Sequence, residues 1–424
     1  MLPLRANSPV RLREHPHPHT TLPVVARFAP LLAALLLAVV ALASLHPSPW
    51  LDSSLPIFRR PPPPRFERKA VPPISGCRDT RLTTLEAREN AAIVVLVREG
   101  DLADLLPTLA NFEARFNARF RYAYVFLASP DEGALSLAFR SAVASALPPG
   151  AEVQYGVVPP AHWTIPTDLS PDQVRAGFAE QEARGVQYAG REGYHHMCRW
   201  YSGLWVRHTL LQPYDWFWRL EPGVQFHCTI SYDPIRFLAL HNKVYGFVIT
   251  VVENMNTVPG LFRAVRTYLS DQGITPRDAS LWRFLVREGP DGQDEYSGCH
   301  FWTNFEIGDL RFFRSSAYQD FFRALDNAGG FYTERWGDAP VRALALGALA
   351  SMDQIHYFDD IGYQHDWFFH CPTRGGAVAG CNCQCPREGE LQGRERGRET
   401  VDMDKDWRFS CLERWRAAVR QSAL

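Results

Sequence analysis

Strand-like and helical segments alternate in the first part of the predicted globular region, and this alternation constrains the fold more than any other sequence feature. The strand-like segments are rich in β-branched and aromatic residues, whereas the segments between them carry leucine and phenylalanine at helical spacing. The predicted strands are 91–97 (AAIVVLV), 121–127 (RYAYVFL) and 153–158 (VQYGVV), and the predicted helices are 102–116 and 133–147. Because a β-α-β-α-β order normally builds a parallel sheet, we expect an α/β fold with ligands at the carboxyl ends of its strands.

The rest of the chain continues both patterns. Helices are predicted at 171–184, 194–208 and 315–327, and strands at 216–221, 244–252 and 300–307. Pro222 cannot continue a central strand, so Glu221 is expected at the carboxyl end of its strand. The length of 424 residues exceeds a typical domain, but large α/β enzymes often centre on one sheet. We therefore expect a single domain with a mostly parallel mixed sheet flanked by helices.

The N-terminal segment predicts a membrane anchor followed by a spacer. Residues 29–45 are apolar and uncharged, and as a helix they would be about 26 Å long, close to the thickness of a thin bilayer. Basic residues before them place residues 1–28 in the cytoplasm and the remainder in the lumen. The alternative is a cleaved signal peptide, because residues 41–43 (ALA) resemble a cleavage site. Residues 46–85 are proline-rich and predict an extended stem, which leaves 86–424 as the luminal domain.

Cysteines gather near the C-terminus. The chain has nine of them, including Cys381, Cys383 and Cys385 in CNCQCP, with Cys371 and Cys411 nearby. In a luminal protein they imply disulfides, and the odd total leaves at least one unpaired or intermolecular. A zinc knuckle is the alternative, although the alternating spacing is not the usual C-x-x-C pattern. We expect a tail tied down by disulfides.

The charge balance argues against nucleic acid as a partner. Lys and Arg total 45 against 46 Asp and Glu, which gives a formal net charge of -1. A protein that holds a nucleic-acid backbone needs a cationic field, and this chain has none overall.

Glu306 is an acidic residue within an aromatic strand-like stretch, HFWTNFEI. An ionised carboxylate buried without a partner costs several kcal/mol, so Glu306 must be paired, exposed in a cleft or kept for chemistry. Arg311 and Arg335 are candidate partners for a purely structural ion pair.

Six blocks of sequence resemble the fungal α-1,2-mannosyltransferases of glycosyltransferase family 15. They occur in order over about residues 88–372 and read YHHMCRWYSG, WFWRLEPGVQFHC, NKVYGF, YSGCHFWTNFEI, GGFYTERWGDAPVRALALG and DDIGYQH. The resemblance implies a GT-A-like fold, GDP-mannose as donor, a mannose-ended glycan as acceptor and Mn²⁺ as cofactor. It also implies retention of the anomeric configuration and a single-pass type II location in the Golgi membrane.

The same resemblance implies roles for four residues. Glu221 of LEPGV and His365 of GYQH match the metal ligands, with Glu221 at the position of the D-x-D motif of other GT-A enzymes. Glu306 of NFEI matches the acid proposed as nucleophile, and Tyr194 of YHHM matches a tyrosine lining the site. Whether Glu306 attacks the sugar or only stabilises a cationic ring carbon stays open. In either role, Glu306→Gln is expected to fold normally and lose transfer.

Further candidates come from the chemistry of the residues. Arg199 lies five residues after Tyr194 and is expected either to hold phosphate or to form a salt bridge. Asp338 and Glu334 are candidate acceptors for sugar hydroxyl groups, and Trp336 is a candidate stacking face. Helix capping is an equally good account of Asp338.

The sequence is also compatible with two other classes of function. One is an inactive GT-A-fold protein that binds mannan or acts as a scaffold. The other is a glycosidase that pairs Glu306 with a second acid and requires no metal.

Overall fold

The computed structural model describes residues 74–83, 87–372, 379–387 and 399–422. The anchor expected at residues 29–45 and the tail before it lie outside the described residues, as does most of the expected stem. Within the described part, no helix has the length and apolar character needed to cross a bilayer. Residues 74–83 belong to the folded body, because Cys77 is bonded to Cys381 and Ile74 is buried. The domain therefore begins before residue 86, the boundary expected from the sequence.

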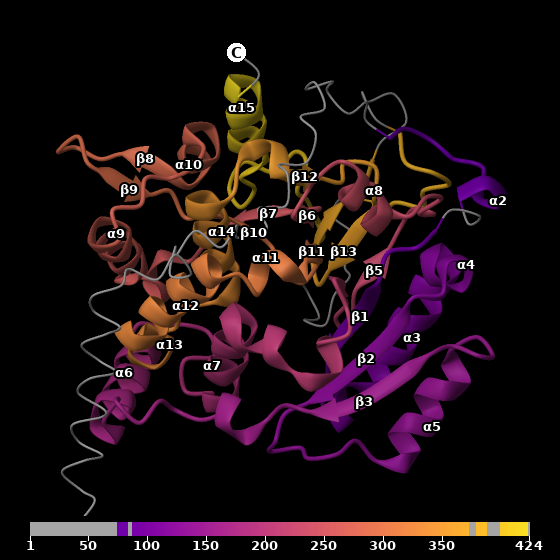
Figure 1. Cartoon of the computed structure of the whole chain (residues 1–424), viewed down its shortest axis with the longest axis horizontal. Coiled ribbons are helices and arrows are strands. Elements are labelled where there is room, and N and C mark those ends of the chain that lie inside the picture. The colour runs from indigo at the N-terminus through magenta and orange to yellow at the C-terminus, as the bar shows by residue number, and fades with distance from the viewer. Residues whose placement is uncertain (1–73, 84–86, 373–378, 388–398, 423–424) are drawn as a thin grey trace, which may run out of the picture. The chain divides into compact units, whose positions relative to one another are not determined.

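A seven-stranded mixed sheet lies at the centre of the described fold (Figure 1). In spatial order its strands are β12 (Ile355–Tyr357), β6 (Tyr245–Phe247), β11 (Glu306–Asp309), β4 (Trp216–Arg219), β1 (Ala91–Leu96), β2 (Ala123–Ala128) and β3 (Val153–Val157). Only β11 runs against the others, since it pairs antiparallel with both β4 and β6 while every other neighbouring pair is parallel. This confirms the expected mostly parallel mixed sheet.

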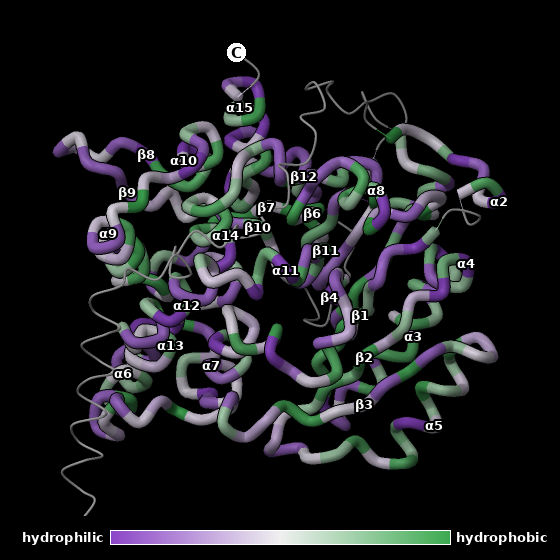
Figure 2. The backbone as a smooth tube through the Cα atoms, viewed as in Figure 1, coloured by the Kyte–Doolittle hydropathy of each residue, from purple (hydrophilic) through white to green (hydrophobic). Residues whose placement is uncertain are grey.

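Helices cover both faces of this sheet. Apolar residues follow one another along β1 and β2, so both of their faces can be buried (Figure 2). Ile93 and Val95 face a core formed with α3 (Leu102–Phe112), α5 (Leu137–Ala146) and α8 (Pro234–Leu240). Ala92 and Val94 face the opposite core, to which most other helices contribute. These helices include α7 (Glu192–Arg199), α9 (Leu261–Asp271), α10 (Ala279–Leu285), α12 (Ser316–Ala328), α14 (Asp338–Leu349) and α15 (Leu412–Ser422). A further helix, α6 (Pro171–Ala183), packs beside α13 (Gly330–Thr333).

Two predicted strands are each divided in the structure. The segment 244–252 gives β6 and β7 (Thr250–Val252), and the segment 300–307 gives β10 (Cys299–Phe301) and β11. β7 and β10 pair with each other outside the main sheet. The alternating pattern was unable to show these breaks because it reports the local period and not the sheet to which a strand belongs. Since β11 is antiparallel, the turn at 302–305 delivers Glu306 to the edge where the parallel strands end.

A four-stranded sheet lies beside that edge. Its strands are β15 (Val401–Asp402), β14 (Phe368–His370), β13 (Tyr363–His365) and β5 (Gln225–Phe226), in that order. A separate hairpin pairs β8 (Val286–Glu288) with β9 (Asp294–Tyr296). The predicted helix at 194–208 is an α-helix only up to Arg199 and continues as a π-helical turn and a 3₁₀ turn.

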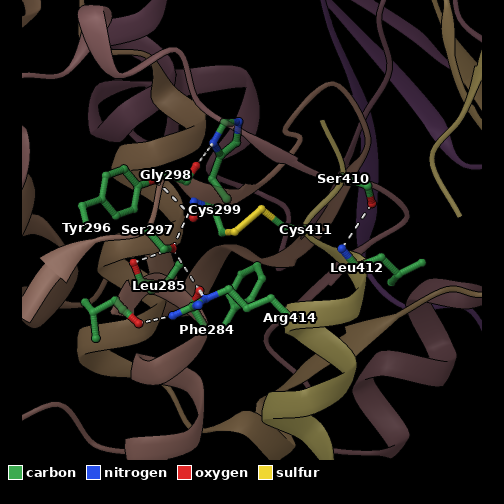
Figure 3. Close-up of a disulfide and its surroundings, with 12 residues drawn as sticks. Phe284, Leu285, Tyr296, Ser297, Gly298, Cys299, Ser410, Cys411, Leu412 and Arg414 are labelled. Carbon is green, nitrogen blue, oxygen red and sulfur yellow. Dashed lines mark hydrogen bonds between the residues drawn. A yellow bond between two sulfur atoms is a disulfide. The ribbon is translucent and has the colours of Figure 1, made fainter. Parts of the chain in front are cut away.

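Disulfides fasten the C-terminal segment to the body, as expected. The described bonds are Cys77–Cys381, Cys228–Cys383, Cys299–Cys411 and Cys371–Cys385, and Cys198 is free and buried. Figure 3 shows how Cys299–Cys411 joins the start of β10 to the start of α15. Nearby, Arg414 of α15 donates hydrogen bonds to the carbonyl groups of Phe284 (2.8 Å) and Arg283 (2.7 Å) at the end of α10.

A buried ion pair links β14 to the segment after β15, and it makes stability depend on pH. His370 Nδ1 lies 2.8 Å from each carboxylate oxygen of Asp404. Burial favours neutral His370, but Asp404 outweighs it and raises the pKa of His370 above its ordinary value, while His370 lowers the pKa of Asp404 against its burial. The histidine contribution is therefore complete below about pH 6.5 and is lost as the pH rises through the raised pKa. The Asp404 contribution is lost as the pH falls below about 4.

We therefore expect His370→Asn to lower the melting temperature more at about pH 5.5 than at about pH 9. Melting curves of both proteins across this range test the prediction. An equal loss at both pH values would contradict it.

Candidate active site

Glu306 occupies the first position of β11 and has no solvent exposure. Arg342 of α14 lies against it, with Nε 3.0 Å from Oε2 and Nη2 3.1 Å from Oε1. Arg219, the residue directly opposite Glu306 in the β4–β11 ladder, places Nη1 3.7 Å from Oε1. Two guanidinium groups thus compensate one buried carboxylate.

Neither arginine expected from the sequence is the partner of Glu306. Arg311 pairs with Asp309, and Arg335 lies 3.9 Å from Glu253. The partner of Glu306 is Arg342, which lies 36 positions further along the chain and is brought in by α14. Burial raises the pKa of Glu306, and the two guanidinium groups offset part of that rise. Glu306 is tolerated among aromatic residues because it is paired.

Arg219 joins three carboxylates into one cluster. Its Nε donates to Glu221 Oε1 at 2.8 Å, its Nη1 donates to Asp338 Oδ2 at 2.6 Å, and Glu306 lies beside it. Its guanidinium carbon lies 3.6 Å from the centroid of the Tyr201 ring, a cation–π contact. Burial opposes the charged form, but the carboxylates outweigh it and raise the pKa of Arg219 well above its ordinary value. Counted as formal charges, two arginines face three carboxylates, an excess of one negative charge that favours a nearby cation.

Asp338 is a member of this cluster and does not act as a helix cap. It is the first residue of α14, whose N-cap is Gly337 and has no side-chain cap. Its Oδ2 accepts hydrogen bonds from Arg219 and from Thr303 Oγ1 (2.8 Å). Burial alone would raise the pKa of Asp338, but Arg219 and Arg342 hold it below its ordinary value. The capping alternative is therefore wrong, and Asp338 is ionised within the site.

Two separate contacts bring His365 to the same edge as Glu221. Gln364 of β13 pairs with Gln225 of β5, so the strand end carrying His365 lies beside the loop that follows Glu221. The ring of His365 also makes an edge contact with Trp302, with centroids 5.2 Å apart. Trp302 immediately precedes Thr303, which contacts Asp338. His365 therefore lies at the border of the carboxylate cluster.

Glu221 and His365 fit a divalent metal that a nucleotide helps to bind. The imidazole Nδ1 of His365 is buried and makes no hydrogen bond within the described part of the chain. The side chain of Glu221 is 27% exposed, so its carboxylate is accessible. One oxygen donor and one nitrogen donor suit Mn²⁺, with other positions left for phosphate oxygens and water. No group of three or more His, Cys, Asp and Glu that could hold a metal occurs among the described residues.

Tyr194 lies on the helical side of the cluster. It is half-buried, and the guanidinium carbon of Arg335 is 5.3 Å from its ring centroid. Burial raises the pKa of Tyr194 well above its ordinary value, and Asp338 and Glu253 act in the same direction. The hydroxyl group therefore stays neutral and can donate a hydrogen bond.

The structure does not bring Arg199 or Trp336 into the cluster. Arg199 binds both carboxylate oxygens of Asp326, at 2.6 and 2.8 Å, and so joins α7 to α12. This is the salt bridge that was the alternative to phosphate binding. Trp336 is 3% exposed and donates its Nε1 hydrogen to Glu334. Its ring faces are covered, so the expected stacking on a sugar is not supported.

Arg219 and Arg342 are the site residues that sequence reasoning missed. Arg342 is the single charged residue of the apolar helical segment 339–349, and Arg219 ends the aromatic strand WFWR. Lone charges in buried elements are almost always paired, and this was the signal in the sequence that could have pointed to buried acidic partners for both arginines.

Comparison with known proteins identifies the class of this site. Residues 68–399 match the family of glycolipid 2-alpha-mannosyltransferases. The "O-glycoside alpha-1,2-mannosyltransferase homolog 5" of Schizosaccharomyces pombe is 41% identical, over 73% of this chain and 77% of the relative. The "Glycolipid 2-alpha-mannosyltransferase" of Saccharomyces cerevisiae is 35% identical, over 76% of this chain and 72% of the relative.

Solved structures of mannosyltransferases are also similar to this fold. The mannosyltransferase Ktr4p of S. cerevisiae in complex with GDP matches with a TM-score of 0.70 and 32% identity, over 82% of this chain and 86% of that one. Core-mannan synthase A of Aspergillus fumigatus in its Mn/GDP form matches with a TM-score of 0.68 and 32% identity, over 79% and 86%.

The fold is therefore that of a mixed α/β glycosyltransferase. The chain belongs to the glycolipid 2-alpha-mannosyltransferase family, glycosyltransferase family 15, and is a mannosyltransferase.

Proposed function

We propose that the chain transfers mannose from GDP-mannose to a mannose-ended N- or O-linked glycan, forming an α-1,2 linkage with retention of configuration and with Mn²⁺. The observation that carries the proposal is the position of Arg219, which joins the candidate metal ligand Glu221 to Glu306 and Asp338 in one cluster. GDP in the Ktr4p structure and Mn with GDP in core-mannan synthase A support the donor and the metal.

Glu221 and His365 would hold the metal at the donor diphosphate. Once bound, Mn²⁺ neutralises the charge that develops on the departing diphosphate. Arg219 fixes the orientation of the Glu221 carboxylate through the bond from Nε. This bond leaves the second oxygen of Glu221 for the metal, so the guanidinium group positions the ligand without replacing it.

Glu306 would act through its charge and not by direct attack. Its carboxylate has no exposure and is held by Arg342, so it cannot reach an anomeric carbon without breaking this pair. The cluster nevertheless carries a net negative charge, which stabilises a cationic ring carbon at close range. This favours the mechanism in which the acceptor enters on the leaving-group face.

The test is incubation of the full-length protein with GDP-mannose, Mn²⁺ and a panel of mannosides, with the product linkage read by NMR. The proposal predicts an α-1,2-linked product and its loss when a chelator is added. Hydrolysis that survives the chelator would indicate a glycosidase. Mannoside binding without any turnover would indicate an inactive binding protein.

Glu306→Gln is now expected to affect stability as well as transfer. Loss of the negative charge should lower turnover by about 10²-fold or more. It also leaves Arg342 without a counterion, so we expect a loss of about 1–3 kcal/mol of stability. Turnover per folded molecule, with the folded fraction read by circular dichroism, separates the two effects. Near wild-type turnover would exclude a catalytic contribution of Glu306.

The type II Golgi location remains a proposal that rests on the sequence of residues 1–85. Extraction of the full-length protein from membranes at alkaline pH would argue against an uncleaved anchor.

A further inference from the structure

A polar groove of about 830 Å³ lies between α9 and α12. The two helices are neighbours in the fold, with α13 following α12 (Figure 1). One end of the groove is formed by Glu334 and Trp336, which precede Asp338 by four and two residues. The groove therefore begins beside the segment that supplies Asp338 to the active site. Its volume is in the range of small-molecule sites.

The end of the groove near the active site is held rigidly. Glu334 Oε2 accepts hydrogen bonds from the backbone N–H of Gly260 at 2.9 Å and from Trp336 Nε1 at 2.5 Å. Gly330 is needed here, because an added Cβ would lie 2.0 Å from the Trp336 ring; at Gly260 an added Cβ would lie 2.5 Å from Glu334 Oε1 and would displace this carboxylate. A carboxylate fixed in this way keeps its other oxygen available to accept from a ligand hydroxyl group.

The lining of the groove suits a neutral ligand with many hydroxyl groups. Arg263 and Arg323 are set against Asp271, Asp320 and Glu334, so their charges largely cancel and leave no field that would attract a diphosphate. Thr267, Gln272 and Asn327 add groups that both donate and accept hydrogen bonds. The half-buried ring of Tyr268, held edge-on against Phe321 with centroids 5.6 Å apart, adds an aromatic surface.

We infer that this groove binds the sugar residues of an oligomannoside acceptor that lie beyond the residue receiving mannose. This inference rests on the proposed function and adds that the acceptor is longer than one sugar. A nucleotide is the wrong ligand for the groove because the lining has three carboxylates and two arginines. The segment 333–340 (TERWGDAP) therefore contributes to both places, with Asp338 in the ion cluster and Glu334 at the start of the groove.

The test compares methyl α-mannoside with an α-linked mannotetraose as acceptors of the full-length protein. We expect kcat/KM for the tetraose to exceed that for the monosaccharide by about fivefold or more, the equivalent of at least one hydrogen bond. The variant Arg263→Ala/Asn327→Ala should reduce this ratio to near one. Arg266→Ala is the matched control, because Arg266 lies on the same helix but outside the groove and bonds to Gln293. It should keep the wild-type ratio.

Saturation-transfer NMR with mannotetraose, without donor, tests the groove independently of turnover. The inference is supported if mannotetraose binding is weakened in the double variant and unchanged in Arg266→Ala. This holds even if no mannoside is elongated. Absence of elongation would count against the proposed function and not against the groove. Equal kcat/KM for the two acceptors would overturn the inference. So would a double variant that still prefers the tetraose and still binds it as tightly as the wild type.

Discussion

Replacing Arg342 with leucine should lower the free energy of unfolding by about 3–5 kcal/mol, because the substitution leaves the Glu306 carboxylate buried without its main counterion. Arg342 has no solvent exposure, and its guanidinium group also donates to the backbone carbonyl of Tyr201 at 2.9 Å and to the hydroxyl group of Tyr318 at 3.1 Å. Urea unfolding followed by circular dichroism measures the change.

Two further variants separate the buried pair from ordinary surface electrostatics. Arg311→Leu removes the exposed partner of Asp309 and should cost about 1 kcal/mol or less. Glu306→Leu combined with Arg342→Leu should recover much of the lost stability, because replacing both members of a buried ion pair with apolar residues is often close to neutral. A loss below about 1 kcal/mol for Arg342→Leu would show that Glu306 is compensated in another way.

Glu221→Gln should lower turnover by about 10²–10³-fold while the protein remains folded, because a metal that neutralises the leaving diphosphate contributes several kcal/mol to the barrier. Glutamine keeps an oxygen that accepts the hydrogen bond from Arg219 Nε, so the local structure should survive. Initial rates of mannose transfer at saturating Mn²⁺ measure the effect.

Glu413→Gln is the matched control, since this carboxylate is exposed and lies on α15 in an ion pair with Arg416. It should transfer mannose at the wild-type rate. A Glu221→Gln variant with more than about a tenth of the wild-type rate would argue against a metal at this position.

The sequence predicted the sheet well because its strands are buried on both faces and leave continuous apolar runs, as in β1 and β2. It predicted less well where a strand leaves the sheet. The segment 300–307 alternates throughout, yet Phe301 belongs to β10 and Glu306 to β11. Only the pairing of β10 with β7 and of β11 with β4 and β6 explains this break, and pairing is not a local property.

Prediction of the candidate site was also limited, because contacts between distant parts of the chain leave no local pattern in the sequence. The segment LEPG placed Glu221 at a strand end through the conformational restriction of proline, and this position is confirmed by the end of β4 at Arg219. The ion cluster was not predicted, because Arg219, Glu306 and Asp338 come from three elements that meet only in the folded chain. For Arg199 the sequence left two roles open, and its contact with Asp326 on another helix is again a matter of tertiary structure.

We propose that Glu221 and His365 bind one metal together with the donor diphosphate. The affinity for GDP, measured by calorimetry with and without Mn²⁺, tests it most directly in the wild type and in Glu221→Gln and His365→Ala. We predict that Mn²⁺ lowers the Kd of GDP by about tenfold or more in the wild type and has little effect in either variant. An equal Kd with and without Mn²⁺ in the wild type, or a metal effect that survives in both variants, would contradict the claim.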